Sequence, residues 1–139
     1  MDKPILEQQG TYKGYKWCVL FQPLGHRTAY VLVPDWHKVY GIDYNKIKIK
    51  CHGGLTFSSH KLLDTEFFGW WIGFDCAHSD DKIDTETQRK YFGEYKRDSY
   101  WDMLQFITGN INDDFATVKN LDFCVAECKN IIDQLIEME

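Results

Sequence analysis

The sequence predicts an α+β fold, in which an antiparallel sheet of about five strands is covered by a C-terminal amphipathic helix. Short runs rich in aromatic and β-branched residues, separated by turn residues, fill most of the chain from 11 to 78. From 121 to 136 the apolar residues instead recur at the i, i+3, i+4, i+7 spacing of a helix with one buried face. A chain of 139 residues, of which 44% are hydrophobic, is long enough to bury a sizeable core. We therefore expect a single domain made of a sheet (11–78), a polar excursion (79–117) and a helix (118–138).

The expected strands share a high content of β-forming residues and lie at 11–21, 28–33, 47–51, 55–57 and 67–74. Segment 47–51 alternates apolar and polar residues, and the glycine pair 53–54 that follows it predicts a tight hairpin with His52 at its tip. The run 67–74 is apolar and aromatic nearly throughout, which indicates a central strand buried on both faces. Residues 35–46 are expected to form an ordered loop or a short helix, and residues 98–107 a further short helix.

A polar cluster is predicted where the hairpin meets the central strand. If the three strands form an antiparallel meander, the last one delivers Asp75, Cys76 and His78 to the sheet edge that holds His52. Cysteine and histidine are the side chains that zinc binds in a tetrahedron, so His52, Cys76 and His78 are predicted zinc ligands. The alternative is that these are hydrogen-bonded residues that brace the glycine turn, because the chain lacks the CxxC pair typical of many zinc sites.

The fourth predicted ligand depends on how two strands pair. His26 is the ligand if strand 28–33 runs antiparallel to strand 47–51, because its start then lies at the same edge. His37, which follows the other end of that strand, takes the place if the pairing is parallel.

A second hypothesis is a site for a small ligand or a protein partner. The predicted binding residues supply charges and flat surfaces that would suit a nucleotide-derived signal, together with the pair Trp70-Trp71; they are Arg27, His37, Tyr44, Asp75 and Asp81. A third hypothesis is a metal-dependent hydrolase of a phosphoester or nucleotide, in which Asp75, Asp80 or Asp81 beside a zinc-bound water would act as general base.

The composition limits the classes of partner. A net charge of −5 argues against direct binding to nucleic acid and favours a basic protein partner, such as an enzyme that itself handles nucleic acid. The run 67–74 is too short and too rich in glycine for a membrane span.

The odd number of cysteines, five, and the absence of an apolar segment behind residues 1–4 predict a cytoplasmic protein with reduced thiols.

Several motifs occur together and in order in this chain: Gly25-His26-Arg27, Tyr30-Val31, His37, Tyr40-Gly41-x-Asp43-Tyr44, His52-Gly53-Gly54-Leu55-Thr56 and Trp70-Trp71-Ile72-Gly73-Phe74-Asp75-Cys76-Ala77-His78. With these motifs the chain resembles a family of small proteins encoded by phages and prophages, over roughly residues 17–81 and 118–137. It departs from the family at Thr28, where cysteine is common, and at Trp36-His37-Lys38, where the family has Gly-His-Pro. Residues 85–117 are particular to this chain.

The resemblance implies a phage accessory role inside the bacterial host. By analogy with such proteins, we expect binding to and inhibition of a host defence component, for example a CRISPR nuclease. Sequestration of a nucleotide-derived immune signal is the alternative.

Overall fold

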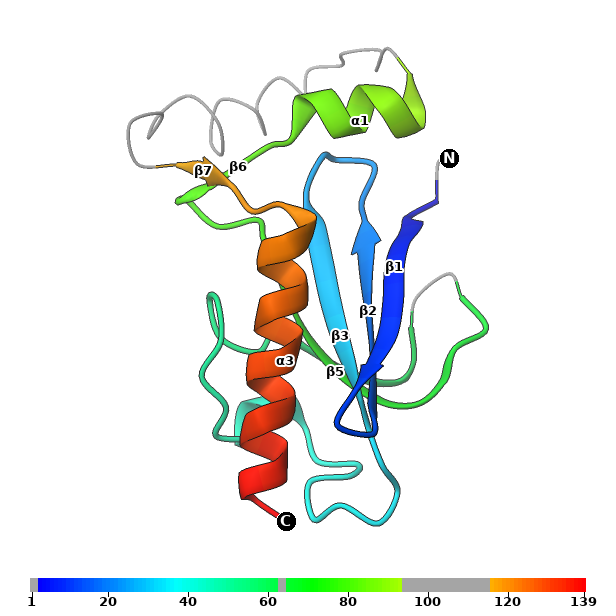
Figure 1. Cartoon of the computed structure of the whole chain (residues 1–139), viewed down its shortest axis with the longest axis vertical. Helices are drawn as coiled ribbons and strands as arrows, with labels where there is room; N and C mark the ends of the chain where they lie inside the picture. Colours follow the sequence, from blue (N-terminus) through cyan, green and yellow to red (C-terminus); the bar gives the residue numbers. More distant parts are fainter. Residues whose placement is uncertain (1–2, 63–64, 94–115) are drawn as a thin grey trace.

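The structure is a computed structural model that describes residues 3–62, 65–93 and 116–139. Its main sheet has five strands in the order β1-β2-β3-β5-β4, and every neighbouring pair is antiparallel. Figure 1 shows the C-terminal helix lying along this sheet, so the predicted α+β class is confirmed. The elements follow the chain in this order: β1 Ile5–Tyr12, β2 Tyr15–Phe21, β3 Arg27–Val33, the 3-10 helix η1 Tyr44–Lys46, β4 Phe57–Lys61, β5 Phe68–Asp75, β6 Asp81–Lys82, α1 Thr85–Phe92, β7 Thr117–Val118 and α3 Leu121–Glu137.

The first predicted strand is in fact the second half of a hairpin. Lys13 and Gly14 both have positive φ, at 49° and 85°, which is the signature of a two-residue type I′ turn. Tyr12 therefore pairs with Tyr15 across the turn. Strand β1 was missed because ILEQQG is largely polar, as an edge strand with exposed side chains is free to be.

Segment 47–51 is not a strand, and the predicted hairpin around His52 does not form. Its alternation is real, since Ile47 and Ile49 are both buried and belong to the core under helix α3. The backbone N–H of Lys50 donates to Gln134 Oε1 at 2.8 Å, so a helix side chain replaces a neighbouring strand as its partner. Of the strand predicted at 55–57, only Phe57 lies in β4.

Strand β5 is the central strand that the sequence predicts. It pairs with β3 on one side and with β4 on the other. Trp70, Ile72 and Phe74 face the core that α3 covers, while Trp71 belongs to a separate apolar cluster on the opposite face.

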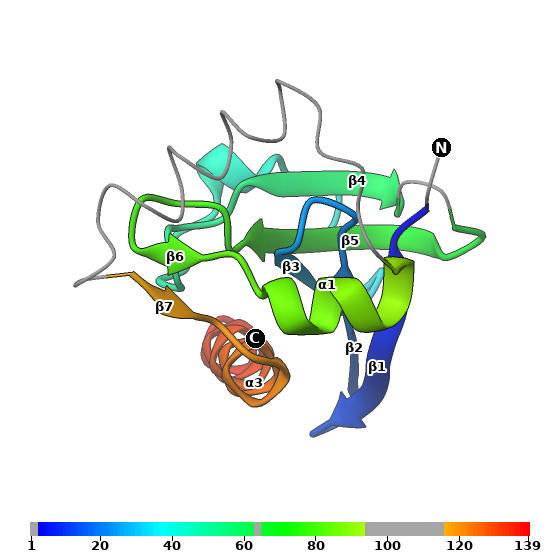
Figure 2. The same ribbon diagram turned by 90° about the horizontal axis from the view of Figure 1, so that it is seen from above.

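Helix α3 covers one face of the sheet, and Figure 2 shows it end-on against that face. The side chain of Asn120 accepts a hydrogen bond from the Phe123 N–H at 2.9 Å and so caps the helix start. Its fully buried positions are those of the predicted apolar stripe: Cys124, Cys128, Ile131, Ile132 and Leu135. None of the helices in the described ranges has the length and hydropathy of a membrane span.

The polar excursion contributes β6, α1 and β7, and α1 crosses the end of the sheet (Figures 1 and 2). The Tyr91 ring of α1 packs edge-on against Phe21 with 5.4 Å between centroids. Strands β6 and β7 pair in parallel, with Asp81 opposite Thr117. The helix predicted at 98–107 lies outside the described residues.

Candidate metal centre

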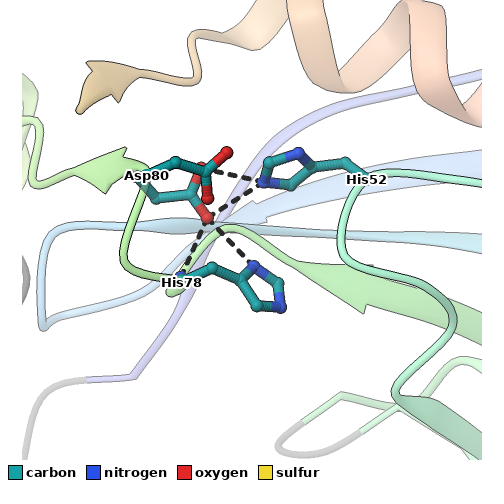
Figure 3. Close-up of side chains that lie close together, drawn as sticks. His52, His78 and Asp80 are labelled. Atoms are coloured by element: carbon teal, nitrogen blue, oxygen red, sulfur yellow. Dashed lines mark hydrogen bonds and ion pairs between the residues drawn. The ribbon is translucent and has the colours of Figure 1, made fainter. Parts of the chain in front are cut away.

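Two chain segments meet beyond the end of β5 and place imidazoles and carboxylates together (Figure 3). After β5 the chain turns tightly, with the Asp81 N–H donating to the His78 carbonyl at 2.9 Å. This turn gathers His78, Asp80 and Asp81, and the pairing of β6 with β7 holds its far end. His52 approaches from the loop that follows segment 47–51.

Helix α3 and the sheet together position His52. Its backbone N–H donates to Glu127 Oε1 at 2.8 Å, which ties the loop to the helix. Its ring lies edge-on to Phe74 of β5 and to Phe123 of α3, with centroids 6.4 and 5.3 Å away. The Nε2 atom donates to Asp81 Oδ1 at 2.8 Å, so His52 is held through both its backbone and its ring.

Ligand atoms of His52, His78, Asp80 and Asp81 all lie within 4.8 Å of one another. Two imidazole nitrogens and two carboxylate oxygens at this spacing can hold a metal ion. Asp81 is buried and His52 and His78 are partly buried, whereas Asp80 is exposed. The centre therefore has a protein-facing side and a solvent-facing side.

The Asp81 carboxylate is the charged group that the two histidines and Lys119 of the centre contact. It is 2% exposed and accepts hydrogen bonds from His52 Nε2, from the His78 N–H at 2.9 Å and from His78 Nδ1 at 3.1 Å. The ammonium of Lys119 lies 3.2 Å from Asp81 Oδ1. Burial acts to raise the pKa of Asp81, but the donors on His52 and His78 outweigh burial and hold that pKa below its ordinary value.

Gly53 is required by the packing of the centre. Its φ is +68°, and a Cβ at this position would come within 2.2 Å of the His78 ring. A side chain here would therefore both strain the backbone and push the imidazole away from Asp81. The glycine of the HGG motif serves this contact and not a hairpin tip.

The predicted ligand set changes in two places, because Asp80 and Asp81 join His52 and His78 where Cys76 and His26 were expected. Cys76 is buried beneath α3, with its sulfur 3.7 Å from that of Cys124. The contact with Cys124 and burial raise the pKa of the Cys76 thiol, which disfavours the thiolate that zinc binds.

His26 stays outside the group of ligand atoms, although it lies in the fields of Asp75 and Asp81. Burial lowers the pKa of its imidazole despite the opposing effect of those carboxylates.

The structure gives His37 a packing role. Its Nδ1 accepts a hydrogen bond from the Val39 N–H at 3.1 Å, so the ring proton is on Nε2. That Nε2 donates to the Leu135 carbonyl at 2.8 Å, in the last turn of α3. The side chain is 4% exposed and is occupied in fastening the helix to the loop after β3.

Arg27 is likewise committed to internal partners. Its Nε and Nη2 bind the two oxygens of Glu7 at 2.7 and 3.1 Å, and its Nη1 binds Asp84 at 3.0 Å and the Lys119 carbonyl at 3.2 Å. The guanidinium is 4% exposed, so it offers no free face to a nucleotide.

Tyr44 and Asp75 are the more exposed members of the predicted ligand-binding set. Tyr44 is 38% exposed and begins η1. Asp75 accepts hydrogen bonds from the Thr56 hydroxyl and the Ala77 N–H, both at 3.1 Å, and lies 3.7 Å from His78 Nε2.

Sequence reasoning named Asp80 and Asp81 only as possible general bases beside the metal and not as its ligands, and it gave Lys119 no role there. The spacing His78-x-Asp80-Asp81 in a turn was a usable signal for Asp80, because such a turn gathers side chains. No comparable signal existed for Lys119, which arrives from a segment 38 positions beyond Asp81 through the pairing of β6 with β7.

Comparisons with protein-family models, with curated proteins and with solved structures found no match.

Proposed function

We propose that the cluster of His52, His78, Asp80 and Asp81 holds a zinc ion, and that this ion stabilises a protein that acts by binding. The observation that carries the proposal is the convergence of two imidazoles and two carboxylates from two separate segments within 4.8 Å. Four protein ligands would fill the tetrahedron of zinc and leave no position for a reactive water. The set therefore favours a structural ion over a hydrolytic one.

The mixture of ligands favours zinc over the hard cations. Calcium and magnesium take oxygen ligands almost exclusively, whereas imidazole nitrogen suits zinc and the later transition metals. In the structure, His52 Nε2 and His78 Nδ1 are hydrogen-bonded to the Asp81 carboxylate, which places a proton on each of these nitrogens. Zinc would replace such protons, so its binding would release protons to the solvent.

Zinc binding is tested with metal-stripped protein, by elemental analysis after reloading and by thermal unfolding with and without zinc. At a free zinc concentration about 100 times the Kd, the ion would add about 2.7 kcal/mol and raise Tm by roughly 8 °C. His52→Gln should abolish the increase. The matched control is His60→Gln, which changes an exposed histidine of β4 outside the cluster.

Loss of the zinc effect in His52→Gln but not in His60→Gln would support the site. Wild-type protein that retains no zinc, or a zinc effect of equal size in both variants, would contradict it.

The partner that we propose for this protein is a component of bacterial defence, met in the host cytoplasm. Two features support this: the resemblance of the HGGLT and GFDCAH segments to phage proteins, and the net charge of −5, which suits a basic nucleic-acid channel. The test is direct binding to purified CRISPR nucleases at low and high salt. Binding that weakens as salt rises would support an electrostatic inhibitor, and no binding to any of them would remove the nuclease as target.

A further inference from the structure

A second candidate site lies on the sheet face that α3 leaves uncovered. Leu32 of β3 and Trp71 of β5 are paired neighbours on this face, opposite the core that packs on the helix. With Thr11, Lys16 and Phe68 they line a cavity of about 390 Å³. This volume is within the range of small-molecule sites, at its lower end.

The walls of the cavity are largely aromatic. Trp71 is buried, and the Phe67 ring stacks against it with 6.3 Å between centroids and 30° between planes. Phe68 also lines the cavity and is 65% exposed, which is unusual for a large apolar side chain. Exposed aromatic rings in a cavity of this size favour a flat ligand, because stacking buries apolar surface on the ligand and on the rings.

Two of the residues that line the cavity carry donors without a protein partner in the part of the chain that the structure describes. Lys16 is exposed, and within the described ranges its ammonium has no ion-pair partner. The indole N–H of Trp71 is buried and has no acceptor among the described residues. A buried donor without a partner is unfavourable, and an acceptor on a ligand that reaches it would satisfy it.

The charge around the cavity contrasts with that of the whole chain. Of the described residues that line it, Lys16 is charged and none is acidic. A second ammonium, that of Lys61, lies 5.7 Å from the centroid of the Phe68 ring. A protein with a net charge of −5 thus presents a cavity with positive charge on this face.

We propose that this cavity binds a planar aromatic anion, meaning an aromatic ring that bears a carboxylate or a phosphate. The ring packs against Phe68 and Trp71, and the anionic group pairs with the ammonium of Lys16. The site is independent of the proposed zinc centre, because it shares no residue with it.

The test is ligand-observed NMR, by saturation transfer and titration, on the zinc-loaded full chain. Indole-3-carboxylate and AMP represent the two sources of the anion, and indole and adenosine are their neutral counterparts. We expect at least one anion to bind, and its neutral counterpart to bind about tenfold more weakly, because it lacks the charge-assisted pair with Lys16. The identity of the anion that binds more tightly distinguishes a carboxylate ligand from a phosphate ligand.

Two variants and one control locate the binding. Lys16→Gln and Phe68→Ala should each weaken binding of the anion about tenfold. Both positions are exposed, so the thermal unfolding of these variants should match that of the wild type. Lys48→Gln removes an exposed ammonium elsewhere and should leave binding unchanged. Absence of saturation transfer at millimolar concentration, or equal binding by the Lys16 and Lys48 variants, would overturn the proposal.

Discussion

Two polar clusters lie near the same end of the sheet, and they have the same formal charge but different chemistry. One consists of Arg27 with Glu7 and Asp84, and the other of Lys119 with Asp80 and Asp81 and the two imidazoles. Each holds one permanent cation and two carboxylates. The guanidinium has donors but no lone pair to offer, whereas each imidazole can give up a proton and become a ligand. The difference separates a cluster that closes the fold from one that can accept a metal ion.

The largest expected effect is on the arginine cluster. Arg27→Met should lower the free energy of unfolding by about 3–5 kcal/mol, because it leaves the carboxylates of Glu7 and Asp84 without their buried cation. Urea denaturation measures this, with Arg89→Gln on the exposed side of α1 as control. A loss below about 1 kcal/mol would mean that the cluster is not needed to close the fold.

The next effect concerns the glycine under His78. Gly53→Ala should cost about 3 kcal/mol and abolish zinc binding, because the new Cβ would meet the His78 ring. Gly41→Ala is a matched control: its φ is +78°, yet nothing lies within 4 Å of the added Cβ. That control should cost only about 1–2 kcal/mol from backbone strain and leave zinc binding intact. Equal losses in the two variants would show that the contact with His78 adds nothing.

Lys119 should limit the affinity of the metal centre. Its ammonium lies 3.2 Å from Asp81 Oδ1 and repels an incoming cation. Lys119→Gln should therefore tighten zinc binding about tenfold in a chelator competition assay. Lys48→Gln, which is remote and exposed, should not change it. Weaker binding in the Lys119 variant would indicate that the lysine positions the carboxylate more than it repels the ion.

The smallest effect is the pH dependence from Asp84. Burial acts to raise the pKa of Asp84, but hydrogen bonds from Thr87 and Arg27 lower it below its ordinary value. A depressed pKa stabilises the fold above the unfolded value of about 3.9, and this contribution disappears as the pH falls through the folded pKa. Asp84→Asn should thus show a smaller drop in urea midpoint between pH 5 and pH 3 than the wild type. An identical drop would assign the acid sensitivity to other carboxylates.

Part of the candidate site was predicted correctly, namely the meeting of His52 and His78, but the structural reason given for it was wrong. The sequence predicts that His52 meets His78, and it assigns the meeting to a hairpin and a meander. In the structure the loop of His52 is instead held by Glu127 of α3, a contact between residues 75 positions apart. The misplacement of Cys76 was avoidable, because it continues the even-numbered series of Trp70, Ile72 and Phe74 that faces the helix.

The sequence by itself determined the central strand, the C-terminal helix and the fold class, because each depends on the local distribution of apolar residues: a continuous apolar run for the strand and a helical period for the helix. The tertiary structure alone decided which polar residues meet. Lys119 reaches Asp81 only through the pairing of β6 with β7. The guanidinium of Arg27 has its ion-pair partners only because Glu7 and Asp84 converge on it from distant parts of the chain. Such contacts leave no period in the sequence, since they depend on how whole elements pack and not on the order of residues within any one of them.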